Sequence, residues 1–403
     1  MKTKKIPNIS LRAEKAPLSP IRKFVPFLQK TKKRGVLVYE LHIGQPDLFT
    51  PPQILKKIKT FKEKIIRYTP SKGIPEVIAA WQKYYKGHKI NFDTSEIIVT
   101  TAGSEAIFFA MTAICNPGEE IIVFEPFYAN YNGYASMAGI KLVPLTTLAK
   151  EGFHLPRKKE IEKKITKKTR GILICNPNNP TGTVYAKKEL EMLIDVAQKY
   201  NLFILADEVY REFVYDAKVH HSMMSFPRAH QRVILLDSIS KRFSACGARI
   251  GCLASKNKKV IQAVTKFAQA RLSSPMVEQL AIVPLLQNPK KYTQKIVKEY
   301  KRRRDTVFKE LQKIPGIECL KPKGAFYTIV KLPVKDAEDF TKWLLTKFSY
   351  KGKTLMLAPA SGFYATLGLG KDEVRIAFVL SPQKLKGAIE VLKKGLEKYK
   401  KNK

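Results

Sequence analysis

Short apolar runs recur through the middle of the chain, and helix-length segments separate most of them. The runs are EIIVT, EEIIVF, KLVPL, GILIC, LFILA, VILLD and IGCLA, which start at residues 96, 119, 141, 171, 202, 233 and 250. Each run has the length and the apolar content of a buried strand. Buried strands that alternate with helices are typical of a mostly parallel sheet with helices on both faces. The pattern therefore predicts an α/β fold, with this sheet in a large central domain.

One intervening segment, KKELEMLIDVAQKYN from residue 187, has the apolar period of a helix. Its residues Leu190, Leu193, Ile194 and Ala197 stand at i, i+3, i+4 and i+7. Side chains at this spacing share one face of an α-helix. The segment is therefore predicted to be an amphipathic helix packed against the sheet.

The segment SPQKLKGAIEVLKKGLEKY near the C-terminus also has a helical pattern. Ser381 can cap the first turn, and Pro382 suits the first helical position. The apolar face comprises Leu385, Ala388, Ile389 and Leu392. Lysines gather at the far end, where the helix dipole favours cations. These features predict a helix that begins at Pro382.

The two ends of the chain differ from its middle and predict a second, smaller α/β domain. A similar Ser-Pro pair at residues 19–20 opens another helical segment, which Pro26 is expected to bend. No repeat or low-complexity linker divides the chain. We therefore expect a large central domain over residues 56–295, which would hold any ligand bound at the sheet, and a small domain built from residues 1–55 and 296–403.

Composition limits the class of protein. The chain has 403 residues, of which 44% are hydrophobic, and this suffices for large cores. No run approaches the roughly 18 apolar residues of a membrane span, and the basic start is not followed by an apolar core. The five cysteines form no CxxC pair, which argues against a disulfide framework or a zinc site. A cytoplasmic protein without a membrane partner or a metal is expected.

The formal net charge of +40 is the most unusual feature of the composition. It permits a non-enzymatic alternative, a basic protein that binds polyanions without turnover. The basic residues are spread over the whole length, however, and they accompany no nucleic-acid-binding motif. Charge runs at helical spacing are usually solvated faces. No specific nucleic-acid partner is therefore expected, although non-specific adhesion to polyanions at low salt is.

Candidate chemistry begins with two turns that follow predicted strands. In VTTAGSEAIFFAMTAICNPG, a glycine turn at Gly103 and Ser104 opens a helix. Free backbone N–H groups at such a turn can bind a phosphate, although an ordinary turn has the same pattern. In ICNPNNPTG, residues 174–182, a dense Asn and Pro loop can aim amide side chains into a cleft or simply turn the chain.

Two further motifs follow predicted strands. In ILADEVYREF, Asp207 ends a strand and Tyr210 follows three residues later. Ligands of open α/β sheets bind at this edge, although a strand-end aspartate can also cap the next helix. In SISKRFSACGARIG, Lys241 stands among Ser238, Ser240 and Arg249. A phosphate turn, an aimed asparagine, an aspartate and a lysine together match the needs of pyridoxal 5′-phosphate.

The order and wording of these motifs resemble the fold-type I aminotransferases of class I/II, in the aspartate aminotransferase superfamily. The resemblance runs from LHIGQPDLFTPP to DEVRIAFVLS, and NPNNPTG together with SKRFSACGARIG is its most specific part. It implies that Lys241 forms the Schiff base with pyridoxal 5′-phosphate. It assigns the cofactor phosphate to Gly103, Ser104, Ser238 and Arg249. Ala102 stands where many relatives have a hydroxyl, so the chain lacks that contact.

The same resemblance implies partners for the cofactor ring. Asp207 pairs with the pyridine nitrogen and keeps it protonated, so that the ring can accept electrons from Cα. Asn179 and Tyr210 bond the phenolic oxygen of the ring. Tyr128, in EPFYANY, matches the aromatic residue that stacks on the ring, and the neighbouring Phe127 is the alternative.

The resemblance also implies substrate contacts and a homodimer. Arg375, in EVRIAF, matches the arginine that clamps the α-carboxylate, for which a planar guanidinium is well suited. Gly44 brings its backbone N–H to the same group, and Asn179 belongs to the same site. Tyr68, in RYTPSKGIPE, resembles the tyrosine that reaches the cofactor phosphate of the neighbouring subunit. The active sites of the dimer are therefore expected to be shared.

The implied reaction is ping-pong transamination. An L-amino acid gives its amino group to the cofactor and leaves as a 2-oxo acid, and a second 2-oxo acid such as 2-oxoglutarate then takes the amino group. An aspartate-like donor is favoured over a broad or aromatic range; in FAQARLSSP, either Gln269 or Arg271 stands where related enzymes bind a distal carboxylate. The enzymatic alternative is a β-lyase on the same fold.

Overall fold

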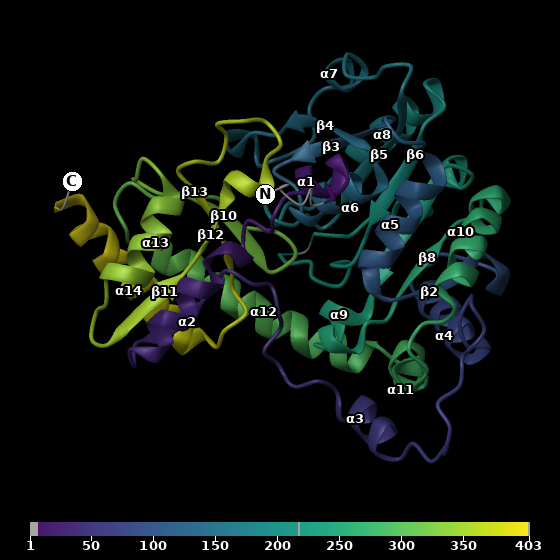
Figure 1. The fold of residues 1–403 in the computed structure, drawn as a ribbon, viewed down its shortest axis with the longest axis horizontal. Helices are drawn as coiled ribbons and strands as arrows, with labels where there is room; N and C mark the ends of the chain where they lie inside the picture. The colour runs from purple at the N-terminus through teal and green to yellow at the C-terminus, as the bar shows by residue number, and fades with distance from the viewer. Residues whose placement is uncertain (1–6, 217, 402–403) are drawn as a thin grey trace, which may run out of the picture.

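The computed structural model describes residues 7–401 apart from residue 217, and a seven-stranded sheet lies at the centre of this part of the chain (Figure 1). Its strands are β2 (Ile97–Thr100), β3 (Glu120–Glu125), β4 (Lys141–Thr146), β5 (Thr169–Cys175), β6 (Phe203–Asp207), β7 (Val233–Ser238) and β8 (Gly251–Ala254). The spatial order is β2-β8-β7-β6-β5-β3-β4. Only β8 runs against its neighbours β7 and β2. The α/β prediction with a mostly parallel sheet is confirmed, and each predicted run forms one of its strands.

Helices cover both faces of this sheet. They include α4 (Pro75–Lys86), α5 (Ala102–Ile114), α6 (Asn130–Ala138), α7 (Lys158–Glu162), α8 (Lys187–Lys199), α10 (Lys258–Arg271) and α11 (Met276–Gln287). Successive residues of β6 alternate between the two faces. Ile204 lies in the core that contains the apolar face of α8, and Leu205 lies in the core under α5. The helix predicted from residue 187 is thus confirmed, with its apolar face fully buried.

Helix α2 (Val25–Lys33) and strand β1 (Leu37–Glu40), from the N-terminal part, lie with most of the C-terminal part of the chain at one end of the molecule, on the left in Figure 1. In contrast, α1 (Leu11–Lys15) contacts α6, and α3 (Pro52–Lys59) contacts α11. Strand β1 pairs in parallel with β11 (Lys353–Met356). A four-stranded sheet has the order β12-β13-β10-β9. Its strands are β9 (Glu318–Cys319), β10 (Tyr327–Lys331), β12 (Ala358–Pro359) and β13 (Glu373–Ala377), and the helices at this end are α2, α12 (Lys290–Leu311), α13 (Ala337–Lys347) and α14 (Pro382–Lys401). Helix α12 runs across the domain limit expected between residues 295 and 296. The limits of the two domains stay a prediction.

Two expectations about the terminal helices have different outcomes. Helix α14 begins at Pro382 and buries all four residues of the predicted apolar face. The bend expected at Pro26 is wrong, because Pro26 lies in the first turn of α2. A proline in the first turn breaks no helical hydrogen bond, so the helix starts there and does not bend.

The carboxyl ends of the parallel strands open toward one edge of the large sheet. Strand β5 leads into the Asn and Pro loop, β6 ends at Asp207, and β7 leads into the short helix α9 (Ile239–Arg242). Two more short helices, α1 (Leu11–Lys15) and α3 (Pro52–Lys59), lie near the N-terminus. No helix within the described part of the chain is long and apolar enough to cross a membrane.

Candidate active site

A cavity of about 890 Å³ lies at this edge of the sheet. Every predicted site residue except Tyr68 lines it: Gly44, Gly103, Ser104, Tyr128, Asn179, Asp207, Tyr210, Ser238, Lys241, Arg249 and Arg375. They come from segments that are far apart in the sequence, so the fold alone brings them together. The cavity is therefore the candidate active site, and the role of each residue in it stays a prediction.

Lys241 projects from α9, directly after β7. Its Nζ donates a hydrogen bond to the carbonyl oxygen of Gly44 at 2.8 Å and lies 3.8 Å from the Sγ of Cys246. Among the described residues, no carboxylate forms an ion pair with it. An amine in a cavity without a carboxylate partner is available for covalent chemistry.

One side of the cavity has the donors that an anion requires. Helix α5 begins here without a side-chain cap, so backbone N–H groups of its first turn have no acceptor from the preceding residue. The Nη1 of Arg249 bonds the carbonyl oxygen of Cys246 at 2.8 Å, and Arg249 has no acidic partner within the part of the chain described. Nearby, the hydroxyls of Ser238 and Ser240 form a hydrogen bond of 2.8 Å. This side suits a phosphate group.

Asp207 has an unusual environment for a carboxylate. Its Oδ2 accepts a hydrogen bond from the hydroxyl of Tyr131 at 2.6 Å, and its Oδ1 accepts one from the backbone N–H of Val209 at 3.3 Å. Burial raises the pKa of Asp207 to about 6, and the bond from Tyr131 lowers it only in part. A buried carboxylate of this kind gains stability from a cationic partner, and the protonated nitrogen of a pyridine ring supplies one.

Arg375 is buried beside the cavity, with only 2% of its surface exposed. Its Nη1 donates to the Oδ1 of Asn179 at 3.0 Å, and its Nη2 donates to the carbonyl oxygen of His42 at 2.6 Å. Its Nε has no hydrogen-bond partner, and no acidic side chain of the described residues forms an ion pair with it. Burial lowers the pKa of Arg375. A buried guanidinium without a counterion calls for an anionic ligand.

The aromatic residues of the site are held by hydroxyl contacts. The hydroxyl of Tyr128 accepts a bond from the Nδ2 of Asn130 at 2.8 Å. The hydroxyls of Tyr210 and Tyr327 are 2.8 Å apart. Phe127 is buried in the core under α5 and does not line the cavity, so Tyr128 is the better placed of the two candidates for stacking.

Three residues considered from the sequence lie elsewhere. Tyr68 is 79% exposed and lies outside the cavity of its own chain. Gln269 is exposed near the end of α10. Arg271 forms an ion pair with Glu105 at 3.0 Å and does not line the cavity. Neither Gln269 nor Arg271 therefore reaches a substrate in the site of its own chain.

The structure adds residues that sequence reasoning missed. They are His42, Asn130, Tyr131, Cys246 and Tyr327, and each lines the cavity or bonds a residue that does. A Cβ at Gly44 would lie 1.6 Å from the hydroxyl of Tyr327, so this glycine is required by the packing of Tyr327. The only sequence signal for Asn130 and Tyr131 is their place in EPFYANY, directly after Tyr128.

Comparison with known proteins places this site in a family. The model of aminotransferase class I and II matches residues 38–392. The aspartate aminotransferase of Pyrococcus horikoshii is 34% identical, over 89% of this chain and 91% of that protein. The aromatic-amino-acid aminotransferase 2 of Thermococcus litoralis is 31% identical, over 97% and 99%. A solved structure of an alanine aminotransferase from Pyrococcus furiosus superposes with a TM-score of 0.88 at 30% identity, over 97% of this chain and 100% of that one.

The chain belongs to the class I and II aminotransferases. Aminotransferase activity follows from this membership, and the family implies pyridoxal 5′-phosphate as cofactor. The cavity residues fit that cofactor, because they combine an uncapped helix start, a buried aspartate and a lysine that has no carboxylate partner among the described residues.

Proposed function

We propose that this aminotransferase moves the amino group of an L-amino acid to a 2-oxo acid, 2-oxoglutarate in the first instance, with pyridoxal 5′-phosphate held at Lys241. One observation carries the proposal. The buried guanidinium of Arg375 has no acidic partner among the described residues and lines the same cavity as the amine of Lys241. A substrate α-carboxylate bound at Arg375 would therefore bring its amino group into the same cavity as the Lys241 amine.

Several residues would hold the cofactor. The first turn of α5 at Gly103 and Ser104, together with Ser238 and Arg249, would bind its phosphate. Asp207 would pair with the ring nitrogen, and a cationic partner would lower the raised pKa of this carboxyl. Pyridoxal phosphate, when bound, accepts the electron pair that a substrate Cα is left with after it loses a proton.

The remaining ring contacts would come from Asn179, Tyr210 and Tyr128. The Oδ1 of Asn179 already accepts from Arg375, which leaves its amide nitrogen as a donor for the phenolic oxygen. The hydroxyls of Tyr210 and Tyr327 are hydrogen-bonded, and either can be the donor. When Tyr327 donates, the hydroxyl hydrogen of Tyr210 is free to bond the same phenolic oxygen. Tyr128 would stack on the ring.

Lys241 would have two tasks in turn. Its amine would anchor the cofactor covalently and, once the substrate amine has taken that place, would accept the Cα proton and pass it to the cofactor carbon that is bonded to the same nitrogen. Its present bond to the carbonyl oxygen of Gly44 shows that the side chain reaches across the cavity toward the segment that also holds His42. Hydrolysis by water would then release the product as a 2-oxo acid and leave the amino group on the cofactor, and a second 2-oxo acid would reverse these steps.

We propose an aspartate-like donor first and a broader or aromatic range second. The relatives named above act on aspartate and on aromatic amino acids, so membership alone does not choose between them. The cations that line the cavity are Arg22, Lys241, Arg249 and Arg375. Lys241, Arg249 and Arg375 already have proposed roles, so Arg22 is the remaining cation that could bind a distal carboxylate. Ile21, Val25 and Leu28 line the same part of the cavity and would suit an apolar side chain.

The proposed unit is a homodimer with shared sites. Tyr68 is 79% exposed and belongs to a segment with two other exposed apolar residues, Ile65 at 60% and Ile66 at 69%. Such a cluster is typical of a surface that another protein covers. Tyr68 of one subunit would then reach the cofactor phosphate of the other.

The test is reconstitution with pyridoxal 5′-phosphate followed by a panel of amino donors with 2-oxoglutarate. The wild-type protein should show a visible absorption band that shifts on addition of donors, and each active donor should give its own 2-oxo acid. Lys241→Ala should bind the cofactor without a covalent link and lose transamination by several orders of magnitude, since the anchor and the proton carrier are the same group. Borohydride should fix the cofactor to the wild type alone.

Three other outcomes would contradict this proposal. Covalent reduction onto a different lysine would refute the assignment of Lys241. Release of ammonia with pyruvate would favour the β-lyase alternative. A protein that binds no cofactor, and binds polyanions instead, would match the non-enzymatic alternative.

A further inference from the structure

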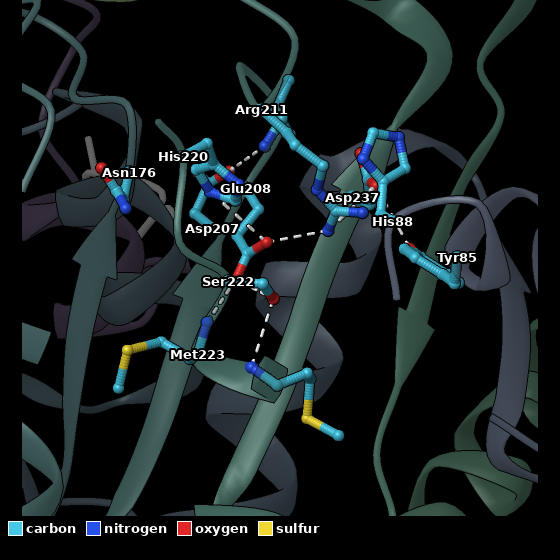
Figure 2. A network of polar contacts seen from close by, with 12 residues as sticks. Tyr85, His88, Asn176, Asp207, Glu208, Arg211, His220, Ser222, Met223 and Asp237 are labelled. Carbon is cyan, nitrogen blue, oxygen red and sulfur yellow. Dashed lines mark hydrogen bonds and ion pairs between the residues drawn. The ribbon is translucent and has the colours of Figure 1, made fainter. Parts of the chain in front are cut away.

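A buried network of charged side chains lies next to the cavity but does not line it. Its core comprises Glu208, Arg211, Glu212, Asp237 and Arg242. All five side chains are at most 7% exposed. Figure 2 shows Glu208, Arg211 and Asp237 in this network.

Each member of the network is close in sequence to a cavity residue. Glu208 follows Asp207, and Arg211 follows Tyr210. On the other segment, Asp237 precedes Ser238 and Arg242 follows Lys241. Asp237 and Ser238 lie in β7, where consecutive side chains point to opposite sides of the strand. In each of the other pairs too, one residue lines the cavity and its neighbour belongs to the network.

The ion pairs cross from one of these segments to the other. The Nε of Arg242 contacts the carboxylate of Glu212 at 3.2 Å, and the Nη2 of Arg211 lies 3.8 Å from the Oδ2 of Asp237. Thus the arginine of each segment pairs with a carboxylate of the other. Within its own segment, Arg211 also bonds Glu208 at 2.8 Å. The two segments that carry Asp207 and Lys241 are cross-linked twice.

Arg242 also closes the turn that carries Ser238 and Lys241. Its Nη2 lies 2.5 Å from the Oδ1 of Asp237, and the same oxygen accepts the backbone N–H of Ser238 at 2.7 Å. The bond therefore joins the two ends of residues 237–242. The guanidinium stacks on the ring of Tyr84, with the ring centre 4.4 Å away. A planar guanidinium can hold two carboxylates and an aromatic ring at once, which a lysine ammonium cannot do.

We propose that Arg242 is a positioning residue, which fixes the Lys241 amine relative to the Asp207 carboxylate through its bonds to Asp237 and Glu212. The inference rests on the proposed function, since Lys241 and Asp207 must act on one cofactor. Both groups would have to engage one bound cofactor at the same time, so a small shift of either segment would disturb their alignment. The charges of Asp237 and Glu208 also add to the effect of burial that raises the pKa of Asp207.

The test compares Arg242→Lys with the wild type after reconstitution with pyridoxal 5′-phosphate. Arg242→Lys keeps the positive charge but loses the double bridge. Misplacement by about 1 Å can cost on the order of 10²-fold in rate, so kcat should fall by about 10-fold to 10²-fold while KM changes little. The pH midpoint of the visible absorption band should shift, because this midpoint depends on the surroundings of the Lys241 amine. The apoprotein of Arg242→Lys should also bind the cofactor less tightly than the wild-type apoprotein does.

Arg304→Lys is the matched control. The Arg304 side chain is also fully buried and bonds the carboxylate of Asp216 at 2.8 and 2.9 Å, but it lies on α12 and does not line the cavity. This variant should lower the melting temperature and leave kcat and the pH midpoint unchanged. If Arg304→Lys shifts both as much as Arg242→Lys does, the effect is general destabilisation and the inference fails.

Two other results separate the inference from the proposed function. A wild-type protein without a visible band would refute the proposed function itself. A normal wild-type band together with a wild-type kcat and midpoint in Arg242→Lys would refute the positioning role alone. Should Arg242→Lys not fold, Glu212→Gln breaks the cross-link from the other segment and leaves the bond to Asp237 in place. The same shift in midpoint and the same loss of kcat are expected for it, and wild-type values would overturn the inference.

Discussion

At the scale of single residues, the site is defined by groups that lack partners. Arg375 is buried without a counterion among the described side chains, and Lys241 forms no ion pair with them. The chain has 74 lysines and arginines. Five arginines of the described residues are buried, and all but Arg375 pair with carboxylates. A buried unpaired cation destabilises the fold unless a ligand completes it. At Arg375, the fold therefore has a buried charge that lowers its stability and that a bound anion would compensate.

Arg375→Met tests this directly. The variant should lose on the order of 10²- to 10⁴-fold in kcat/KM for every amino donor, because two charge-assisted bonds to the α-carboxylate disappear. Its melting temperature should stay the same or rise, since an uncompensated buried charge is replaced by an apolar side chain of similar length. The donor panel and thermal unfolding of the apoprotein measure the two effects.

The opposite pair of results would contradict this reading of Arg375. Unchanged kcat/KM for all donors would place the carboxylate site elsewhere. A large drop in melting temperature would mean that the bonds to Asn179 and His42 alone account for the burial of Arg375.

Sequence reasoning found single residues where a motif surrounds them and missed them where only packing does. Lys241, Asp207 and Asn179 stand at or after the ends of predicted strands, and their motifs taken together, not the strand ends alone, pointed to a site. Arg211 and Arg242 could not be distinguished from surface charges, because their partners are fixed only by the pairing of β6 with β7. Tyr131 was hidden in the same way, since its bond to Asp207 joins residues 76 positions apart.

At the scale of elements too, local patterns could be predicted and long-range packing could not. Continuous apolar runs predicted the strands of the large sheet and apolar period predicted α8 and α14, because burial within a sheet or along one helical face leaves a recognisable pattern. The two-residue strands β9 and β12 are too short to show a period. The pairing of β1 with β11 joins opposite ends of the chain, and no local pattern specifies it. Helix starts were harder, as Pro26 illustrates.

Arg271 is an example of a residue whose role belongs to the elements around it. Its Nη1 bonds Glu105 in α5 at 3.0 Å and the hydroxyl of Ser274 at 2.6 Å. Its Nη2 bonds the carbonyl oxygens of Ser71 and Val99 at 3.1 and 3.3 Å. One side chain thus connects the end of α10 to the start of α5, to β2 and to a loop.

Arg271→Met should therefore destabilise the protein by about 1 to 3 kcal/mol, because it removes the cation from the partly buried carboxylate of Glu105 and the donor from two backbone carbonyl oxygens. Its kcat/KM should change by the same factor for aspartate, alanine and aromatic donors. Arg170→Met is the control, since the pair of Arg170 with Glu119 is on the surface and such pairs contribute little. A selective loss with aspartate and glutamate would show instead that Arg271 meets a distal carboxylate.

At the scale of the whole molecule, the structure describes only half of the proposed active unit. The cavity of one chain lacks Tyr68, which lies on the surface with Ile65 and Ile66. A dimer in which this segment reaches across would bury these apolar side chains and complete both sites.

Mixing two impaired variants tests the shared site. Lys241→Ala lacks the anchor and Tyr68→Ala lacks the proposed contact with the phosphate of the neighbouring site. Unfolded and refolded together, they should form mixed pairs in which one site has both Lys241 and Tyr68 intact, so transamination should recover above the sum of the separate proteins. Light scattering should give twice the chain mass of 45.8 kDa.

The control is Lys241→Ala refolded with Lys241→Arg, which offers no intact site in any pair and should recover nothing. Absence of recovery in the first mixture, with dimers present, would mean that each chain completes its own site.

The parallel pair of β1 and β11 has a consequence for the order in which the protein can form during synthesis. Leu37 aligns with Lys353, and Thr31 bonds the carbonyl oxygen of a residue 314 positions later. At roughly 5 to 20 residues per second, the ribosome needs on the order of 15 to 60 s to make that distance of chain. Throughout that interval the large sheet can assemble, but the early strand has no partner. Strand β1 is therefore among the first elements to be synthesised and among the last to pair.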